Sequence, residues 1–286
     1  MTGNGRLARR FRRLSAEGRA GLVTFVTAGD PNPDISREMV CQLPTAGADI
    51  IELGMPFSDP MADGPAIQQA SLRALRAGQT MARTFAQVAA LRTIDTETPV
   101  VLMGYFNPIY RYGVDRFAAD AATAGVDGLI VVDLPPEEHD ELRLPATAAG
   151  LDLVALVAPT TDDARLPRVV GPASGFVYYV SIAGITGTAS AAAADIAPAV
   201  TRIRRTTGLP IAVGFGIRTP EQTAAVAAVA DAAVVGSAIV DRIAESLGPD
   251  GTPVADPVAS VGEFVAALAA GARSAQRRTA SGAGAE

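Results

Sequence analysis

The sequence contains no lysine, one histidine and one cysteine. All 24 basic residues are therefore arginines. Without a lysine amine, the chain cannot form a Schiff base with a carbonyl substrate. A metal site of several histidines or cysteines is equally excluded, and no loop typical of an all-carboxylate site is present, so we expect no metal. Acid–base chemistry must then come from Asp, Glu, Tyr, Ser, Thr or backbone groups.

Long apolar runs and excess positive charge are also missing. No run approaches the ~20 residues needed to cross a bilayer, and none resembles a signal peptide. The formal net charge of −6 gives no electrostatic support for a nucleic-acid or anionic-membrane partner. The single cysteine, Cys41, excludes an internal disulfide framework and fits a reducing compartment. We therefore expect a cytoplasmic protein.

Eight short apolar runs recur along the chain, with segments of helical character between them. They are continuous rather than alternating, as in parallel strands covered by helices. Eight strand–helix units predict an α/β fold, a single (β/α)8 TIM barrel. A doubly wound open sheet is the alternative, but no G-x-G-x-x-G follows the first strand. The predicted strands are 22–27, 49–54, 99–104, 128–133, 152–158, 176–181, 210–214 and 232–236.

Three segments extend this barrel, which we place at residues 1–270. The basic, amphipathic stretch "RLARRFRRLSAEG" predicts an extra N-terminal helix that plugs the bottom of the barrel, with a targeting helix as the alternative. A long interval after the second strand predicts an extra loop and a helix that starts at Asp63-Gly64-Pro65 and stops at Gly78. Residues 271–286 have no apolar face and predict a disordered tail.

Glu52 interrupts the apolar second strand, "DIIELG". An ionised carboxylate is costly to bury, so the group either gains a partner or raises its pKa. A raised pKa makes a general acid or base, whereas an arginine from another strand would make a structural ion pair. The strand-end position beside a long loop favours function.

Other carboxylates follow the same strand ends. Asp63 is explained locally as an N-cap of the next helix, and Asp59 as a turn residue before Pro60. Asp133 ends the fourth strand and could reach the same barrel mouth. The segment "LPPEEHDE" after it contains the only histidine, His139, and predicts a solvated or partner-facing loop.

Glycine-rich turns follow the last two strands, in "VGFGIRTPEQ" and "VVGSAIVDRI". Barrels often bind phosphate with backbone N–H groups of these two loops and a helix N-terminus. Gly216, Gly236 and Ser237 are the donors we expect, although such glycines also serve tight turns alone. The small-residue stretch 181–195 after the sixth strand predicts either a lid over a ligand or an idle flexible loop.

Together, "ELGMPFSDPMADGPAIQ", "FVTAGDP", "VDLPPEE", "GITG", "VGFGI" and "VVGSAIV" resemble the tryptophan synthase α subunit family, in order and over about residues 5 to 270. The resemblance implies a lyase that cleaves indole-3-glycerol phosphate by a retro-aldol reaction to indole and glyceraldehyde 3-phosphate. It also implies transfer of indole to a β subunit that carries pyridoxal phosphate, in an α2β2 complex. No cofactor is expected in this chain.

The resemblance assigns roles to individual residues. Glu52 and Asp63 match the family's catalytic carboxylates. The substrate-binding positions match Phe25, Tyr178, Thr186, Gly187, Gly216, Gly236 and Ser237. Thr186 corresponds to the lid threonine that meets the catalytic aspartate. One departure is Ile182-Ala183, where some members carry an arginine, and this bears on how the lid closes.

Indole-glycerol phosphate supplies its own electron sink when ring carbon C3 is protonated, so two carboxylates suffice: Glu52 for proton transfer and Asp63 to stabilise the ring nitrogen. Two alternatives stay open. One is a barrel isomerase or epimerase acting on sugar phosphates, and the other is a non-catalytic barrel that binds or activates a β subunit.

Overall fold

The computed structural model describes residues 4–181, 189–214 and 216–275. Its strands form one parallel sheet in the order β5-β4-β3-β2-β1-β9-β8-β7-β6. The strands are β1 (Gly21–Thr27), β2 (Ile50–Gly54), β3 (Val100–Gly104), β4 (Gly128–Val131), β5 (Asp152–Leu153), β6 (Ala155–Val157), β7 (Val177–Val180), β8 (Ile211–Gly214) and β9 (Ala232–Val235).

The two edge strands of this sheet, β5 and β6, are separated only by Val154. The backbone N–H of Val154 still donates to Leu129 O at 2.9 Å, so pairing with β4 continues to this point. Because β5 pairs with β4 and β6 pairs with β7, the divided strand nearly closes the sheet on itself. The predicted TIM barrel is therefore confirmed, and its predicted fifth strand, 152–158, is two short strands.

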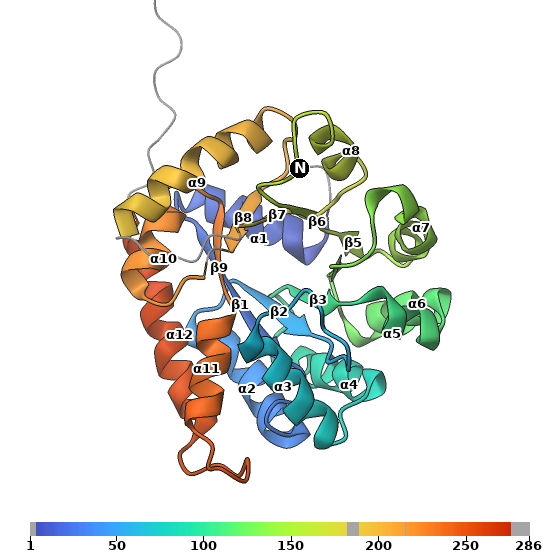
Figure 1. Ribbon diagram of the computed structural model, residues 1–286, viewed down its shortest axis with the longest axis vertical. Helices are drawn as coiled ribbons and strands as arrows, with labels where there is room; N and C mark the ends of the chain where they lie inside the picture. The colour runs from blue at the N-terminus through green and yellow to red at the C-terminus, as the bar shows by residue number, and fades with distance from the viewer. Residues whose placement is uncertain (1–3, 182–188, 215, 276–286) are drawn as a thin grey trace, which may run out of the picture.

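Helices surround the sheet (Figure 1). In the described residues the α-helices are α1 (Arg6–Ala16), α2 (Pro33–Ala46), α3 (Pro65–Arg76), α4 (Met81–Arg92), α5 (Phe106–Tyr112), α6 (Val114–Ala124), α7 (Asp140–Ala148), α8 (Leu166–Val170), α9 (Ala189–Arg204), α10 (Pro220–Ala227), α11 (Ser237–Glu245) and α12 (Pro257–Ser274). A 3-10 turn, η1 (Pro136–Glu138), precedes α7. None of the described helices is long and apolar enough to span a membrane.

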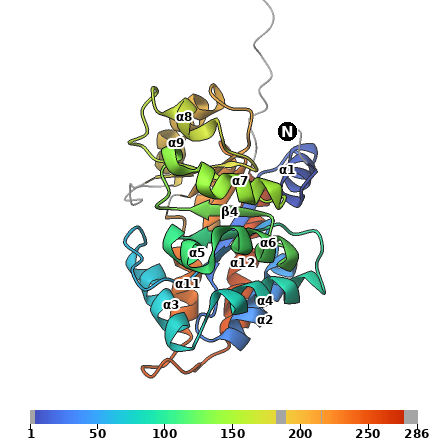
Figure 2. The same cartoon turned by 90° about the vertical axis from the view of Figure 1, so that its right-hand side faces the viewer.

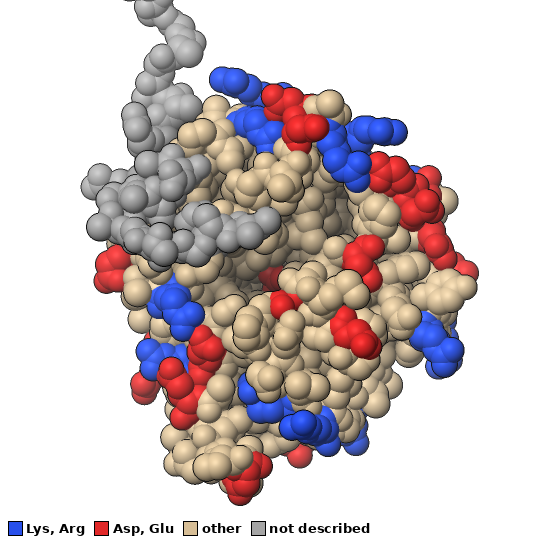
Figure 3. Space-filling view, viewed as in Figure 1, with Lys and Arg blue, Asp and Glu red and all other residues tan. Residues whose placement is uncertain are grey.

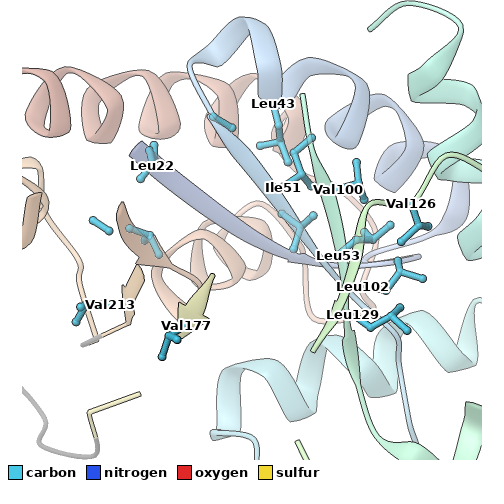
Figure 4. Packing of buried hydrophobic residues seen from close by; sticks show 14 of the residues in the cluster. Leu22, Leu43, Ile51, Leu53, Val100, Leu102, Val126, Leu129, Val177 and Val213 are labelled. Carbon is cyan, nitrogen blue, oxygen red and sulfur yellow. The ribbon is translucent and has the colours of Figure 1, made fainter. Parts of the chain in front are cut away.

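Strand side chains divide between two cores. Those that point outward pack against the helices, and Figure 4 shows members of this outer core, among them Leu22, Leu53 and Leu102. Those that point inward fill the barrel, among them Val23 and Ile50. Because strand side chains alternate, this pattern places Glu52 on the inner face, between its register partners Phe25 and Val101.

The N-terminal helix lies at the bottom of the barrel, as predicted. In the side view, α1 and α3 lie at opposite ends of the molecule (Figure 2). Leu7, Phe11 and Leu14 on one face of α1 are buried with the inner core. The Phe11 ring lies 5.7 Å from that of Phe176, which precedes β7. The apolar face of α1 therefore closes the barrel at the N-terminal ends of the strands.

The extra helix after the second strand is also present as α3. Pro65 occupies its first turn, and Gly78 follows its end with φ +80°, as predicted. The N-cap is Gly64, with no side-chain cap hydrogen bond, so the alternative that Asp63 caps this helix is wrong. At the other end of the chain α12 continues to Ser274, and residues 276–286 lie outside the described part, so the disordered tail stays a prediction.

Candidate active site

A cavity of about 170 Å³ opens at the C-terminal ends of the strands. Figure 3 shows this face hollowed, with acidic side chains in and beside the hollow and arginines mainly toward the edge of the view. The lining residues come from β1, β2 and β3, from β7, β8 and β9 with the loops that follow them, and from the first turns of α3 and α11. They are Phe25, Glu52, Ile67, Met103, Tyr178, Val180, Ser181, Gly214, Gly216, Ile217, Arg218, Val234, Gly236, Ser237 and Ala238.

Glu52 is the buried titratable group of this cavity. It is 1% exposed, and its Oε2 atom has no hydrogen-bond partner among the described residues. Burial, together with the negative charge of Asp63, raises the pKa of Glu52 to about 8. The alternative of an ion pair with an arginine finds no support among the described ion pairs, which do not include Glu52. At neutral pH the side chain is therefore mainly protonated.

Tyr178 shares the cavity with Glu52. Burial raises the pKa of Tyr178 well above its usual value, and the charge of Glu52 adds to the effect. The tyrosine consequently stays a neutral hydroxyl that can donate a hydrogen bond. Gly214 leaves room for it, because a Cβ atom there would collide with the Tyr178 hydroxyl.

Asp63 lines a much smaller neighbouring cavity of about 10 Å³. Phe25, Ile67 and Met103 line both cavities, so the spaces that Glu52 and Asp63 border share these apolar side chains. Burial raises the pKa of Asp63, and a hydrogen bond from Tyr105 opposes this shift. The site thus combines two carboxylates in different surroundings: Glu52 in an apolar interior and Asp63 beside a hydroxyl donor.

The predicted phosphate-loop residues of the described chain border the larger cavity as well. Gly216, Gly236 and Ser237 line it, and Ser237 is the first residue of α11. Gly216 has φ +63°, in the left-handed region that favours glycine. The N-terminus of α11 directs free backbone N–H groups and the positive end of its dipole toward this region. The arrangement can hold an anionic group.

Two site predictions lie outside the described residues, namely Thr186 and Gly187. The same holds for the Ile182-Ala183 departure and for residues 182–188 of the predicted lid. Within the predicted lid, residues from Ala189 onward belong to the first turns of α9.

Asp133 has a structural role at the start of α5 instead. Its side chain is exposed and accepts a hydrogen bond from the backbone N–H of Phe106 at 2.7 Å, in the first turn of α5. It lines a separate cavity of about 270 Å³ together with His139. The histidine contacts Leu134 O through Nε2 at 3.0 Å, and burial lowers its pKa. Asp59 accepts from Ser58 Oγ at 2.6 Å within its own turn.

Sequence reasoning missed Tyr105, Ile67, Met103 and Arg218. Tyr105 directly follows a predicted strand, which is the same signal that singled out Asp133. Arg218 lines the larger cavity, but its guanidinium donates to Asp241 at 2.6 Å. Among the described residues, no three or more His, Cys, Asp or Glu side chains come together as a metal site would require.

Comparison with known proteins agrees with this geometry. The family model described as tryptophan synthase alpha chain matches residues 11–269. A crystal structure of the tryptophan synthase alpha chain from Legionella pneumophila subsp. pneumophila is 37% identical, with a TM-score of 0.85 over 95% of this chain and 98% of that one. A tryptophan synthase chain from M. tuberculosis, in an open form with BRD0059 bound, is 36% identical, with a TM-score of 0.83 over 94% and 99%. The chain therefore belongs to the tryptophan synthase alpha chain family, lyases of tryptophan biosynthesis that work with a beta subunit.

Proposed function

We propose that this chain cleaves indole-3-glycerol phosphate to indole and glyceraldehyde 3-phosphate by a retro-aldol reaction. One observation carries the proposal: a buried, mainly protonated Glu52 lines a cavity whose walls include apolar side chains, such as Phe25 and Ile67, and the glycine-rich turns at Gly216 and Gly236. Apolar walls suit an aromatic ring, the start of α11 suits a phosphate, and Glu52 borders the same space as an acid.

Glu52 transfers the protons. Its carboxyl group donates a proton to ring carbon C3, which turns the indole into an indoleninium-like electron sink. The resulting carboxylate then takes the proton of the glycerol hydroxyl next to the breaking bond. As that hydroxyl becomes the aldehyde carbonyl, the carbon–carbon bond electrons return to the ring and release indole. Glu52 ends protonated, ready for another turnover, and its pKa near neutrality suits both transfers.

Asp63 stabilises the positive charge that develops on the ring. A carboxylate near the ring N–H is worth most in the transition state, when the ring nitrogen carries that charge. The role requires Asp63 as an anion, and the hydrogen bond from Tyr105 favours this form. Phe25, which lines both cavities, is the proposed face of the indole pocket.

The phosphate is held by backbone N–H groups of Gly216, Gly236 and Ser237, with Gly187 added from the loop after β7. Thr186 of the same loop is proposed to meet Asp63 when substrate is bound. Binding energy from this end of the substrate orients the reacting bond against Glu52. Tyr178 borders the same space as Glu52 and contacts the glycerol portion.

The released indole passes to a beta subunit in an α2β2 complex. The beta subunit supplies the pyridoxal phosphate that this chain does not need for its own step. Met61, in the loop after β2, is 84% exposed, and Tyr110 on α5 is 61% exposed. Large apolar side chains that are left in solvent beside an active site fit a surface covered by another subunit.

The experiment measures indole release from indole-3-glycerol phosphate, with and without a beta subunit. We expect release that the beta subunit accelerates. A pentulose phosphate serves as the competing substrate. Its turnover without indole release would favour a sugar-phosphate isomerase or epimerase, and no turnover under either condition would favour a non-catalytic binding partner.

A further inference from the structure

Tyr105 joins the end of strand β3 to the loop that carries Asp63. Its ring is buried, and it lies 5.3 Å from the ring of Phe57, which belongs to that loop. Its hydroxyl oxygen accepts a hydrogen bond from the backbone N–H of Ala62 at 2.9 Å. Both contacts attach the loop after β2 to the rigid barrel.

The contacts of the Tyr105 hydroxyl determine where its hydrogen points. A phenol has one hydrogen to donate and can also accept. Because the oxygen accepts from Ala62, the hydroxyl hydrogen is available for the Asp63 side chain, which lines the same small cavity as Tyr105. A hydrogen bond from Tyr105 lowers the pKa of Asp63 accordingly. The backbone of Asp63 is held as well, since its N–H donates to Pro60 O at 3.1 Å and its carbonyl accepts from Gln68 Nε2 at 2.9 Å.

The loop needs such an attachment. Met61 and Ala62, the two residues before Asp63, are exposed, so packing against the barrel does not fix this part of the loop. A carboxylate that acts by electrostatics has to be held within about 0.5 Å of its productive position. Tyr105 is the group that can do this, because it is itself buried at the end of a barrel strand.

We propose that Tyr105 is a positioning residue, which holds the Asp63 carboxylate in place through the tyrosine hydroxyl. The proposal rests on the proposed function, because it concerns the same two-carboxylate site. It assigns Tyr105 no contact with the substrate.

The test compares Tyr105→Phe with the wild type in indole release across pH. The variant keeps the ring beside Phe57 and loses only the hydroxyl. We expect kcat to fall by about 10- to 100-fold, which is the range for a lost hydrogen bond to a charged group, with KM within about 3-fold because the phosphate end is untouched. The acidic limb of the pH profile should move to higher pH, because the hydrogen bond from Tyr105 lowers the pKa of Asp63.

Tyr112→Phe is the matched control. In the wild type the Tyr112 hydroxyl donates to Asp120 Oδ2 at 2.6 Å, so the variant removes a tyrosine–aspartate hydrogen bond between α5 and α6. Neither Tyr112 nor Asp120 lines the two cavities of the site. A Tyr105→Phe enzyme with the wild-type kcat and pH profile would overturn the proposal. So would a loss of kcat with an unmoved acidic limb, which would indicate a purely structural role.

A second measurement is independent of turnover. In protein labelled with 13C at the aspartate carboxyl carbons, the carboxyl resonance of Asp63 should titrate at a higher pH in the Tyr105→Phe variant than in the wild type. If the wild type releases no indole but this shift is present, the proposed function fails while the positioning role stands. An unchanged Asp63 titration refutes the role whatever the activity.

Discussion

Asp49 and Glu52 lie three residues apart on one side of the barrel, yet their surroundings are opposite. Asp49, before β2, is 3% exposed and binds Arg19 through two contacts of 2.8 and 2.9 Å. It also accepts from the backbone N–H of Leu22 at 3.0 Å. Glu52 is 1% exposed and has an oxygen without a partner among the described residues. Burial alone therefore does not decide what a carboxylate does; its partners do.

The bottom of the barrel repeats the pattern of Asp49. Asp127, before β4, contacts Arg6 at 3.0 Å and Arg92 at 2.8 Å and accepts from the N–H of Val100 at 2.8 Å. Arg10 contacts Asp49 at 3.4 Å. Both Arg6 and Arg10 belong to α1. Two arginines of the N-terminal helix are thus paired with aspartates at the N-terminal ends of the strands. At the mouth, the two carboxylates have no arginine among their described contacts, and their pKa values rise.

The largest effect should come from Glu52→Gln. Glutamine keeps the shape of the side chain but cannot transfer a proton, so the rate of indole release should fall on the order of 1,000-fold. The affinity for glycerol 3-phosphate, measured by calorimetry, should stay within about 2-fold because the phosphate end is unchanged. A variant that releases indole at the wild-type rate would contradict the assignment of Glu52.

Asp49→Asn should have the opposite effect, a loss of stability with activity retained. It leaves Arg19 without its buried partner, so the free energy of unfolding, measured with urea, should fall by about 3 kcal/mol. Activity per folded molecule should stay within about 2-fold, since Asp49 lies at the other end of the strand. A loss of activity at unchanged stability would mean that the two ends of the barrel are not independent.

The pH dependence of stability should also differ between the ends. The pKa of Glu52 is about 8 in the folded protein and 4.5 without the fold. Between these values the folded state binds more protons than the unfolded state, so stability falls as pH rises. The Glu52→Gln variant has no such group, so its free energy of unfolding should rise by about 4 kcal/mol relative to that of the wild type between pH 5 and pH 9. Parallel stability curves for the two proteins would contradict a raised pKa.

The smallest effect should come from Ser237→Ala. The backbone N–H groups at the start of α11 remain, so KM should rise by about 3-fold with kcat unchanged, as expected when ground-state and transition-state binding weaken equally. Ser15→Ala, an exposed serine on α1 at the bottom, is the control and should change neither constant. A large fall in kcat for Ser237→Ala would place Ser237 in the chemical step rather than in phosphate binding.

Much of the barrel could be predicted because each strand is a local apolar run and each helix has local start and stop signals. Glu52 stood out for the same reason, as a charge within such a run. The division of the fifth strand at Val154 was not predictable, because nothing in "DLVALVA" marks where its two neighbours pair.

Long-range contacts explain the remaining differences. Asp63 and Asp133 both lie at or after strand ends; the local sequence suggests helix capping or catalysis for Asp63 and a place at the barrel mouth for Asp133. Asp133 caps α5, while Asp63 contacts Tyr105, more than 40 positions along the chain. Those outcomes depend on how neighbouring strand ends meet at the mouth, which no sequence window contains. The assignments of Glu52 and Asp63 as catalytic residues stay predictions.

The central claim is that the mouth of this barrel keeps a buried carboxyl group protonated at neutral pH. The most direct measurement is a pH titration by NMR of protein labelled with 13C at the glutamate carboxyl carbon, with Glu52→Gln used to assign the resonance. One glutamate resonance, missing in the variant, should titrate with a pKa of about 8. If every glutamate instead titrates near the ordinary value of about 4.3, Glu52 is ionised at neutral pH and cannot be the proton donor.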